Sequence, residues 1–180
     1  VAADVTPAEV GVSRVGNDLV VKVLGTEAQV TVRSWFQGGA AQFMELQRVE
    51  FAGDGTIWDV ATLRAKVLEG TAGDDVLLGY EDSGDVISGL GGDDVLYGQA
   101  GADTLQGGAG ADTLIGGEGG DVLDGGPNND FMVGEAGNDT YLFGRGSGLD
   151  RAEDWDATEG HLDVIQVGAD VAPGEVSVRR

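Results

Sequence analysis

The sequence predicts an all-β chain whose central part coils into a parallel β-roll, flanked by a small β-rich N-terminal unit and a C-terminal cap. Three observations support this fold class. Glycine accounts for 33 of the 180 residues, and glycine suits tight turns. Short apolar triplets rich in β-branched residues, which favour strands, recur between the turns. The triplets repeat every nine residues, with one interval of ten, and a short fixed period indicates stacked repeats.

The first 69 residues are expected to form the small β-rich unit, which would also cap the roll. Apolar residues alternate or cluster in short runs, and glycine-containing turns separate these runs. This pattern favours an antiparallel meander. The expected elements are strands at 10–14, 19–24, 29–33 and near 43–51, a loop at 38–39 after Trp35 and Phe36, and a helix at 59–68.

Residues 70–151 contain eight consecutive repeat units. Position one is always glycine, position six is always aspartate, and position eight is always large and mostly aliphatic. By phase the units read GTAGDDVLL, GYEDSGDVIS, GLGGDDVLY, GQAGADTLQ, GGAGADTLI, GGEGGDVLD, GGPNNDFMV and GEAGNDTYL. One inward residue per unit cannot form a core alone, so the units must stack. Two units would complete one coil, and successive coils would lie about 4.8 Å apart.

The position-six aspartates are the candidate site residues. Units two apart would lie on the same side of the coil, so the aspartates would form two ladders. The first ladder contains Asp75, Asp94, Asp112 and Asp130, and the second contains Asp85, Asp103, Asp121 and Asp139; Asp150 follows near the end of the array. Carboxylates stacked one strand spacing apart repel by about 1 kcal/mol in water, and by more when partly buried. A divalent cation between successive aspartates would turn this repulsion into attraction.

The donor atoms indicate calcium. The chain has no cysteine and one histidine, His161, so nitrogen and sulfur ligands are scarce and zinc is disfavoured. Turn carbonyls beside the glycines can complete an oxygen shell, whereas magnesium demands a stricter octahedron. The gaps between successive ladder members predict about six ions or more. Whether Asp154, Asp156 and Asp163 also bind metal stays open, and Asp74 and Asp93 at position five are expected to be solvated turn residues.

Composition excludes several classes of function. The net charge of −22 argues against a nucleic-acid partner, because phosphate binding needs a positive surface. Residues 70–148 hold 15 acidic side chains and one basic one, Arg145. No apolar run approaches the ~18 residues of a membrane span. One histidine, no cysteine and six serines leave little material for a nucleophilic triad, so no enzyme activity is expected in this chain.

The repeat resembles the haemolysin-type calcium-binding repeat of the RTX proteins, G-G-x-G-x-D-x-U-x, over residues 70 to about 151. The stretch NDLVVKV…VTVRSWF…VEFAGDGTIWD resembles the small related domain that accompanies such repeats. The resemblance implies a calcium-binding structural module of a large secreted bacterial protein, outside the cell or on its surface. It also implies export by type I secretion machinery, with calcium folding the chain afterwards. The sites around Asp85 and Asp130 depart most from the pattern, because the second unit has an insertion and the seventh lacks its fourth-position glycine.

A second repeat relates the two ends of the sequence, which are similar to each other. Residues 4–14 read DVTPAEVGVSR and residues 170–180 read DVAPGEVSVRR, with seven of eleven positions identical. We expect the chain to be about one period of a tandem array, with residues 152–180 forming a cap and the start of the next repeat. Other repeats of the same parent chain are then its expected partners. Two contexts stay open: an adhesin or surface-array repeat, and an accessory domain of a secreted hydrolase or polysaccharide-modifying enzyme.

Overall fold

The computed structural model of the protein divides into two compact units, Val1–Val67 and Leu68–Arg180. The described residues are 1–2, 4–15, 17–32, 48–81, 83–156 and 160–177. The loop expected at 38–39, with Trp35 and Phe36, and the first part of the strand expected near 43–51 lie outside them. No helix in the described part of the chain is long and apolar enough to cross a membrane.

The first unit is a meander with a second, smaller pair of strands. Its elements are the 3-10 helix η1 (Pro7–Glu9), strands β1 (Val10–Val15), β2 (Asp18–Val23), β3 (Gln29–Val32), β4 (Arg48–Glu50) and β5 (Ile57–Asp59), and helix α1 (Val60–Lys66). Strands β1, β2 and β3 form an antiparallel sheet, and β4 pairs with β5. The expected meander and helix are therefore confirmed. Asp59 caps α1 by accepting a hydrogen bond from the Thr62 N–H at 2.8 Å, as helix-capping residues do.

A conventional hydrophobic core forms within this first unit. Leu19, Phe51 and Leu63 are fully buried, and Trp58 is nearly so. The rings of Phe51 and Trp58 meet edge to face with centroids 4.8 Å apart, a favoured aromatic geometry. This unit thus has apolar contacts of its own that require no metal.

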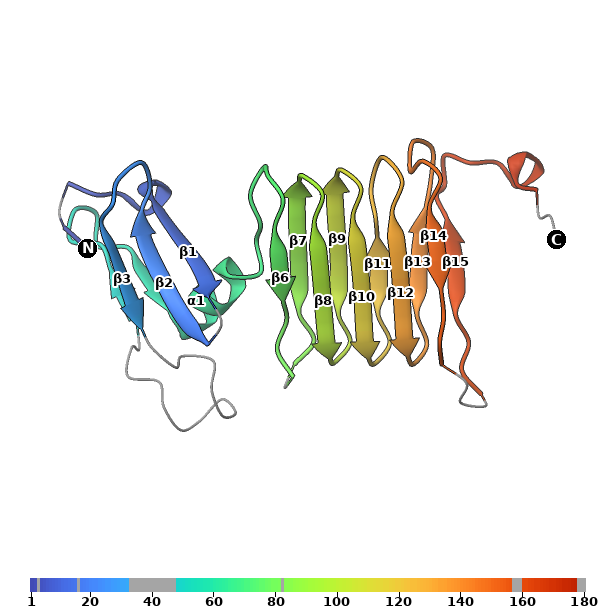
Figure 1. Cartoon of the computed structure of the whole chain (residues 1–180), viewed down its shortest axis with the longest axis horizontal. Helices are drawn as coiled ribbons and strands as arrows, with labels where there is room; N and C mark the ends of the chain where they lie inside the picture. Colours follow the sequence, from blue (N-terminus) through green and yellow to red (C-terminus); the bar gives the residue numbers. More distant parts are fainter. Residues whose placement is uncertain (3, 16, 33–47, 82, 157–159, 178–180) are drawn as a thin grey trace. The chain divides into compact units, whose positions relative to one another are not determined.

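The second unit is a parallel β-roll, as the repeat predicts. Its elements are β6 (Val76–Leu78), β7 (Val86–Gly91), β8 (Val95–Ala100), β9 (Thr104–Ala109), β10 (Thr113–Glu118), β11 (Val122–Asp124), β12 (Phe131–Ala136), β13 (Thr140–Phe143), β14 (Arg151–Glu153), β15 (Val164–Val167) and the 3-10 helix η2 (Pro173–Glu175). Even-numbered strands form one parallel sheet and odd-numbered strands another, each in sequence order (Figure 1). Each coil therefore contains two repeat units.

The interior of the roll is a column of position-eight side chains. Strand register stacks Leu96 on Leu114 in one sheet and Leu105 on Leu123 in the other. All four are fully buried, and burying such a side chain stabilises by about 1.5–3 kcal/mol. The residue that periodicity identified as inward is thus the residue that makes the core.

The two sheets continue past residue 151, where the sequence loses its nine-residue phase. Strand β14 pairs with β12, and β15 pairs with β13. The last coil therefore has the same strands as the others but longer turns. Ile165 stacks on Tyr141 in register and is 66% exposed, because no further coil covers it among the described residues.

Tyr141 replaces an aliphatic residue near this end and adds a polar bridge. Its hydroxyl accepts a hydrogen bond from the Gly134 N–H at 2.9 Å and donates one to the Glu153 carbonyl at 3.0 Å. Burial raises the pKa of Tyr141 to about 12, so the hydroxyl keeps its proton at neutral pH. The bridge ties the penultimate coil to the last one.

Substituting Tyr141→Phe is expected to lower the free energy of unfolding of the calcium-loaded chain by about 1–3 kcal/mol, because a buried N–H and a carbonyl lose their partner. Denaturant unfolding in calcium measures this. Tyr97→Phe is the control, since Tyr97 is 37% exposed and should show no change. Equal stability of the two variants would contradict a structural role for the bridge.

Candidate metal site

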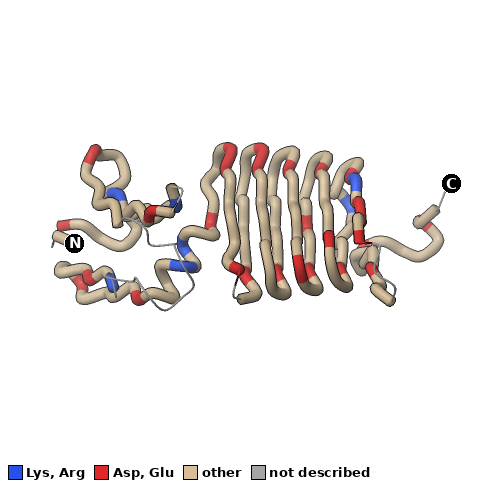
Figure 2. The backbone as a smooth tube through the Cα atoms, turned by 60° about the horizontal axis from the view of Figure 1, so that its bottom comes forward, with Lys and Arg blue, Asp and Glu red and all other residues tan. Residues whose placement is uncertain are grey.

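Each position-six aspartate lies immediately before a strand of the roll. The turns that carry these aspartates lie along both edges of the sheets, where acidic residues gather (Figure 2). The first ladder precedes the even-numbered strands and the second precedes the odd-numbered strands. The members are Asp75, Asp94, Asp112, Asp130 and Asp150 in the first, and Asp85, Asp103, Asp121, Asp139 and Asp163 in the second. Asp163, which the sequence left open, ends the second ladder just as Asp150 ends the first.

From the second member of each ladder onward, one oxygen of the carboxylate links neighbouring coils. The Oδ1 atom accepts a hydrogen bond from the backbone N–H of the aspartate one coil earlier. For example, the Asp103 Oδ1 accepts from the Asp85 N–H at 2.7 Å, and the Asp103 N–H donates to the Asp121 Oδ1 at 2.8 Å. Across both ladders these distances run from 2.7 to 3.1 Å. The same contact thus repeats from the first coil to the last.

The other oxygen, Oδ2, is buried without a partner in the six middle aspartates. Those residues are Asp94, Asp103, Asp112, Asp121, Asp130 and Asp139. Their exposed fractions are 1–3%. Leaving a buried polar atom unpaired costs about 1–3 kcal/mol, and more when the group is charged. No donor among the described residues serves these six oxygens, which stand in two rows and are therefore available to a cation.

Burial raises the pKa of all six carboxyls, and repulsion from neighbouring aspartates raises it further. The pKa reaches about 6 for Asp121 and Asp130. The ionised form, which metal binding needs, is therefore less stable in the bare roll than in water. A cation beside these carboxylates would supply the missing counter-charge.

The position-one glycines provide room beside these oxygens. A Cβ atom on Gly98 would lie 2.5 Å from the Asp103 Oδ2 and 2.4 Å from the Gly116 carbonyl oxygen of the next coil. Gly107 faces the same two kinds of oxygen, at 2.5 Å and 2.7 Å. Carboxylate and carbonyl oxygens thus flank one point. Residues of this kind fit a hard cation such as calcium, which binds oxygen ligands alone.

From the third unit onward, position four has a different property, a positive φ. Gly101 and Gly119 have φ values of 131° and 133°. In the seventh unit Asn128 occupies this position with a φ of 92°, which asparagine tolerates better than most residues. Asp130, two residues later, keeps the same ladder contact and burial as the other members. The irregular seventh unit therefore follows the geometry of its neighbours.

Comparison with known proteins identifies the repeat. The family model of the RTX calcium-binding nonapeptide repeat matches the chain four times, at residues 67–83, 81–114, 106–141 and 115–149. Residues 67–149 are an RTX calcium-binding repeat array. The model of the haemolysin-type calcium binding protein related domain also matches, at residues 18–62 of the first unit. The RTX roll is therefore a calcium-binding module.

One curated relative of the RTX chain is iron-regulated protein FrpA of Neisseria meningitidis serogroup C. The two are 38% identical over 79 residues, which is 44% of this chain and 7% of FrpA. The matched part is thus a small fraction of that protein's length. No solved structure matches the chain.

Side chains alone do not complete a metal shell in the RTX roll. Among the residues that the structure describes, no group of three or more His, Cys, Asp or Glu side chains is arranged to hold an ion. Successive aspartates stand one coil apart, so an ion can take carboxylates from only one or two of them. An ion beside these aspartates would take its remaining ligands from backbone carbonyls or water.

Position-five side chains form a further link between coils of the RTX roll that the sequence did not predict. The Asp74 Oδ1 accepts from the Asp93 N–H at 2.9 Å, and the Asp93 Oδ1 accepts from the Ala111 N–H at 2.8 Å. Asn129 and Asn138 make the same contact. Asp74 and Asp93 are exposed, but they are not merely solvated. The signal was present, since four of the eight units carry Asp or Asn at this position.

The substitution Gly98→Ala is expected to weaken calcium binding by about tenfold or more, because the new methyl group occupies the space beside the Asp103 Oδ2 and a backbone carbonyl. Gly73→Ala is the matched control: nothing lies within 4 Å of its added Cβ, and its φ is not positive. Calcium titration of both variants measures the effect. Unchanged affinity in Gly98→Ala would show that this space is not used.

Proposed function

We propose that the RTX roll is a noncatalytic structural module that folds when calcium binds outside the cell. One observation supports this above all: six buried aspartate oxygens without hydrogen-bond partners stand in two rows, each beside a glycine, and four of them also beside a backbone carbonyl. Calcium neutralises the carboxylates and joins one coil to the next. The metal therefore contributes folding free energy directly.

The proposed calcium ligands are the ladder aspartates together with turn carbonyls. The aspartates are Asp75, Asp85, Asp94, Asp103, Asp112, Asp121, Asp130, Asp139 and Asp150, with Asp163 added from the structure. Ladders of five members leave four gaps each, so the number of ions is about six to eight.

The expected calcium affinity and the acidic charge of the roll both favour folding outside the cell. Extracellular calcium modules bind with Kd values of about 10⁻⁴ to 10⁻³ M, so such sites stay empty inside a cell and fill outside it. Without calcium, the surplus of acidic side chains over one arginine in residues 70–148 opposes compaction. A chain that stays loose inside the cell suits export through type I secretion machinery, and the RTX match supports this route.

The repeated sequence at residues 4–14 and 170–180 favours a repeat of an adhesin or surface array over an accessory domain of a secreted enzyme. An accessory domain attached to an enzyme does not need to recur within the chain. Copies of this whole unit in the parent sequence would support the array. The parent protein's activity is a separate question, because the match to FrpA covers only 7% of that protein.

The ion count tests the proposed site directly. We expect equilibrium dialysis to find about six to eight calcium ions per chain, and anomalous scattering from calcium to place them between successive ladder aspartates. Magnesium at the same concentration should leave most sites free. Two ions or fewer, or ions away from the ladders, would contradict the proposed site.

A further inference from the structure

The segment at residues 170–177 has the same local structure as the segment at residues 4–10. In each segment an identical Asp-Val pair leads into a proline-containing turn that ends in Glu-Val. The proline begins a 3-10 helix in both, η1 in the first unit and η2 in the second. The resemblance between the two ends is therefore one of structure as well as sequence.

Three equivalent hydrogen bonds define both turns. The Val5 N–H donates to the Ala2 carbonyl at 3.1 Å, as the Val171 N–H does to the Gly168 carbonyl at 3.0 Å. The Glu9 N–H donates to the Thr6 carbonyl, as the Glu175 N–H does to the Ala172 carbonyl. Each glutamate side chain accepts from the backbone N–H three residues earlier, at 2.9 Å and 2.8 Å. Since the surroundings differ, the segment itself determines this turn.

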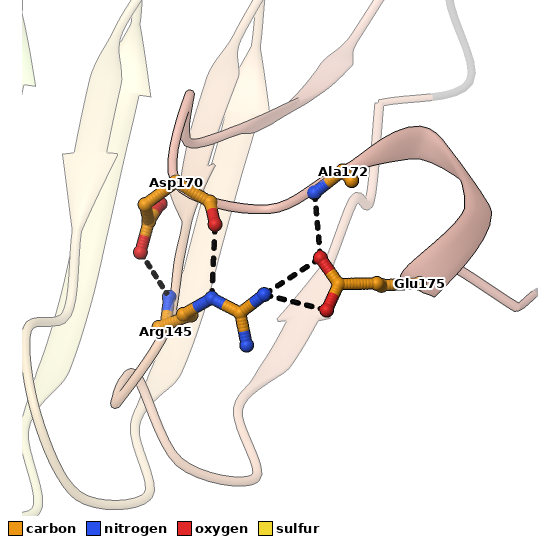
Figure 3. A network of polar contacts seen from close by, with 4 residues as sticks. All are labelled: Arg145, Asp170, Ala172 and Glu175. Atoms are coloured by element: carbon orange, nitrogen blue, oxygen red, sulfur yellow. Dashed lines mark hydrogen bonds and ion pairs between the residues drawn. The ribbon is translucent and has the colours of Figure 1, made fainter.

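In the second unit, Arg145 holds this turn beside the roll (Figure 3). The Arg145 Nη2 donates to both carboxylate oxygens of Glu175 at 2.6 Å, and its Nε donates to the Asp170 carbonyl at 2.9 Å. The Arg145 backbone N–H donates to the Asp170 Oδ2 at 3.3 Å. Arg145 is also the one basic residue among residues 70–148. These contacts form a clasp, defined by Arg145, Asp170 and Glu175.

The residues that Arg145 holds are kept in the other copy of the segment. Asp4 and Glu9 correspond to Asp170 and Glu175. Both are exposed in the first unit, and no ion pair joins either of them to a residue that the structure describes. The N-terminal segment therefore carries the groups for a clasp without an arginine among the described residues to receive them.

The valine that follows each turn differs in burial between the two copies of the segment. Val10 begins β1, pairs with Val23 of β2 and is 6% exposed. Its counterpart Val176 is 47% exposed. The same side chain is thus buried where a meander follows and uncovered where the described residues provide none.

We propose that Arg145 is a docking residue for the first turn of a following unit like residues 1–67, carried by the same polypeptide. The partner is an Asp-Val-x-Pro-x-Glu-Val segment, and Asp170–Val176 is the copy already in place. In this arrangement the clasp fixes how each new unit leaves the end of the preceding roll. The proposal does not depend on calcium-driven folding, so either one can fail alone.

The clasp orients the segment rather than stabilising the fold. Its ion pair is exposed, and exposed pairs add little to stability because water screens them. We therefore expect Arg145→Ala to leave the melting temperature of the calcium-loaded chain unchanged. The same substitution should speed amide exchange at Ala172 by about two- to fivefold.

Arg151→Ala is the control for this measurement, since Arg151 is also exposed and forms an ion pair, with the half-buried Glu153. It should leave exchange at Ala172 unchanged. Glu175→Ala should speed exchange at Ala172 at least as much, because it removes the side chain that accepts from the Ala172 N–H. If Arg145→Ala leaves exchange at Ala172 unchanged, Arg145 does not hold the segment and the proposal is wrong.

A longer chain tests the partner. Residues 15–67 are appended after Arg180, so that Val15 follows it as it follows Arg14. The protein has no cysteine, so Val176→Cys provides a single thiol and Val10→Cys provides the buried reference. Thiol labelling of Val176→Cys should be fast in the 180-residue chain and slow in the extended chain, approaching the rate of Val10→Cys.

Two outcomes would overturn the proposal. Labelling of Val176→Cys that stays fast in the extended chain means that residues 170–180 do not begin a new unit, whether or not the appended residues fold. Concentration-dependent dimers of the 180-residue chain that require both Glu9 and Arg145 would assign the clasp to separate molecules. Sedimentation velocity of the chain and of its Glu9→Gln variant distinguishes contact between molecules from contact within one.

Discussion

Removing calcium is expected to unfold the RTX roll while leaving apolar contacts in the first unit. In the roll, the core is a single column of position-eight side chains, and each coil depends on its neighbours. Six buried carboxylates lose their counter-charge when the metal leaves. Ligand at one hundred times its Kd stabilises by about 2.7 kcal/mol per site, so six or more sites exceed the ~5–15 kcal/mol that stabilises an ordinary domain.

Circular dichroism during a calcium titration measures this transition. The chelated chain should lack most of the strand signal of residues 76–167, and the signal should return cooperatively as calcium is added. Phe51, Trp58 and Leu63 give the first unit a core without metal, so part of the near-ultraviolet signal should persist. Titration with magnesium is the control. A complete β spectrum in excess chelator would refute calcium-dependent folding.

Substituting Asp103→Ala is expected to remove two calcium ions, whereas Asp75→Ala removes one. Asp103 has a ladder neighbour on each side and a buried Oδ2 without a partner. Asp75 begins its ladder, and its Oδ2 instead accepts from the Thr71 N–H at 2.6 Å and the Thr71 hydroxyl at 2.9 Å. The interior residue thus has an oxygen available to a cation, and the terminal one has that oxygen already bonded.

The expected loss of stability in saturating calcium is about 5 kcal/mol for Asp103→Ala and about 2–3 kcal/mol for Asp75→Ala. Calcium counting and denaturant unfolding measure the two quantities separately. Asp103→Asn serves as a further control, because it keeps the hydrogen bond to the Asp85 N–H and removes the charge. Equal calcium loss from Asp103→Ala and Asp75→Ala would mean that ions are not shared between coils.

The nine-residue periodicity of the sequence predicted the roll because each repeat unit satisfies the same local requirements. Glycine at position one, aspartate at position six and an apolar residue at position eight determine the turn, the ladder and the core. Where the turns between strands lengthen, the nine-residue spacing is lost although the strands still pair. Asp163 lies 24 residues after Asp139, and its Asp-Val-Ile triplet repeats that of residues 85–87. That triplet, rather than the spacing, was the available signal.

The eight aspartates occupy the same position of the repeat, and the structure separates them. Asp75 and Asp85 receive hydrogen bonds on Oδ2 from the backbone N–H of Thr71 and Tyr80. The six that follow have none there. Periodicity cannot reveal this difference, because it arises from where each coil lies in the stack.

The hydrogen bonds of the aspartate ladders all point in one direction along the roll. In every coil the aspartate N–H needs an Oδ1 from the coil that follows it in sequence. A partly formed roll that grows toward the N-terminus therefore presents carboxylates at its growing edge, and one that grows toward the C-terminus presents bare amides. A cation can pair with the free Oδ1 atoms at the first kind of edge but not with the amides at the second. We therefore expect calcium to favour growth from the Asp150 and Asp163 end, with each finished coil serving as the template for the one before it.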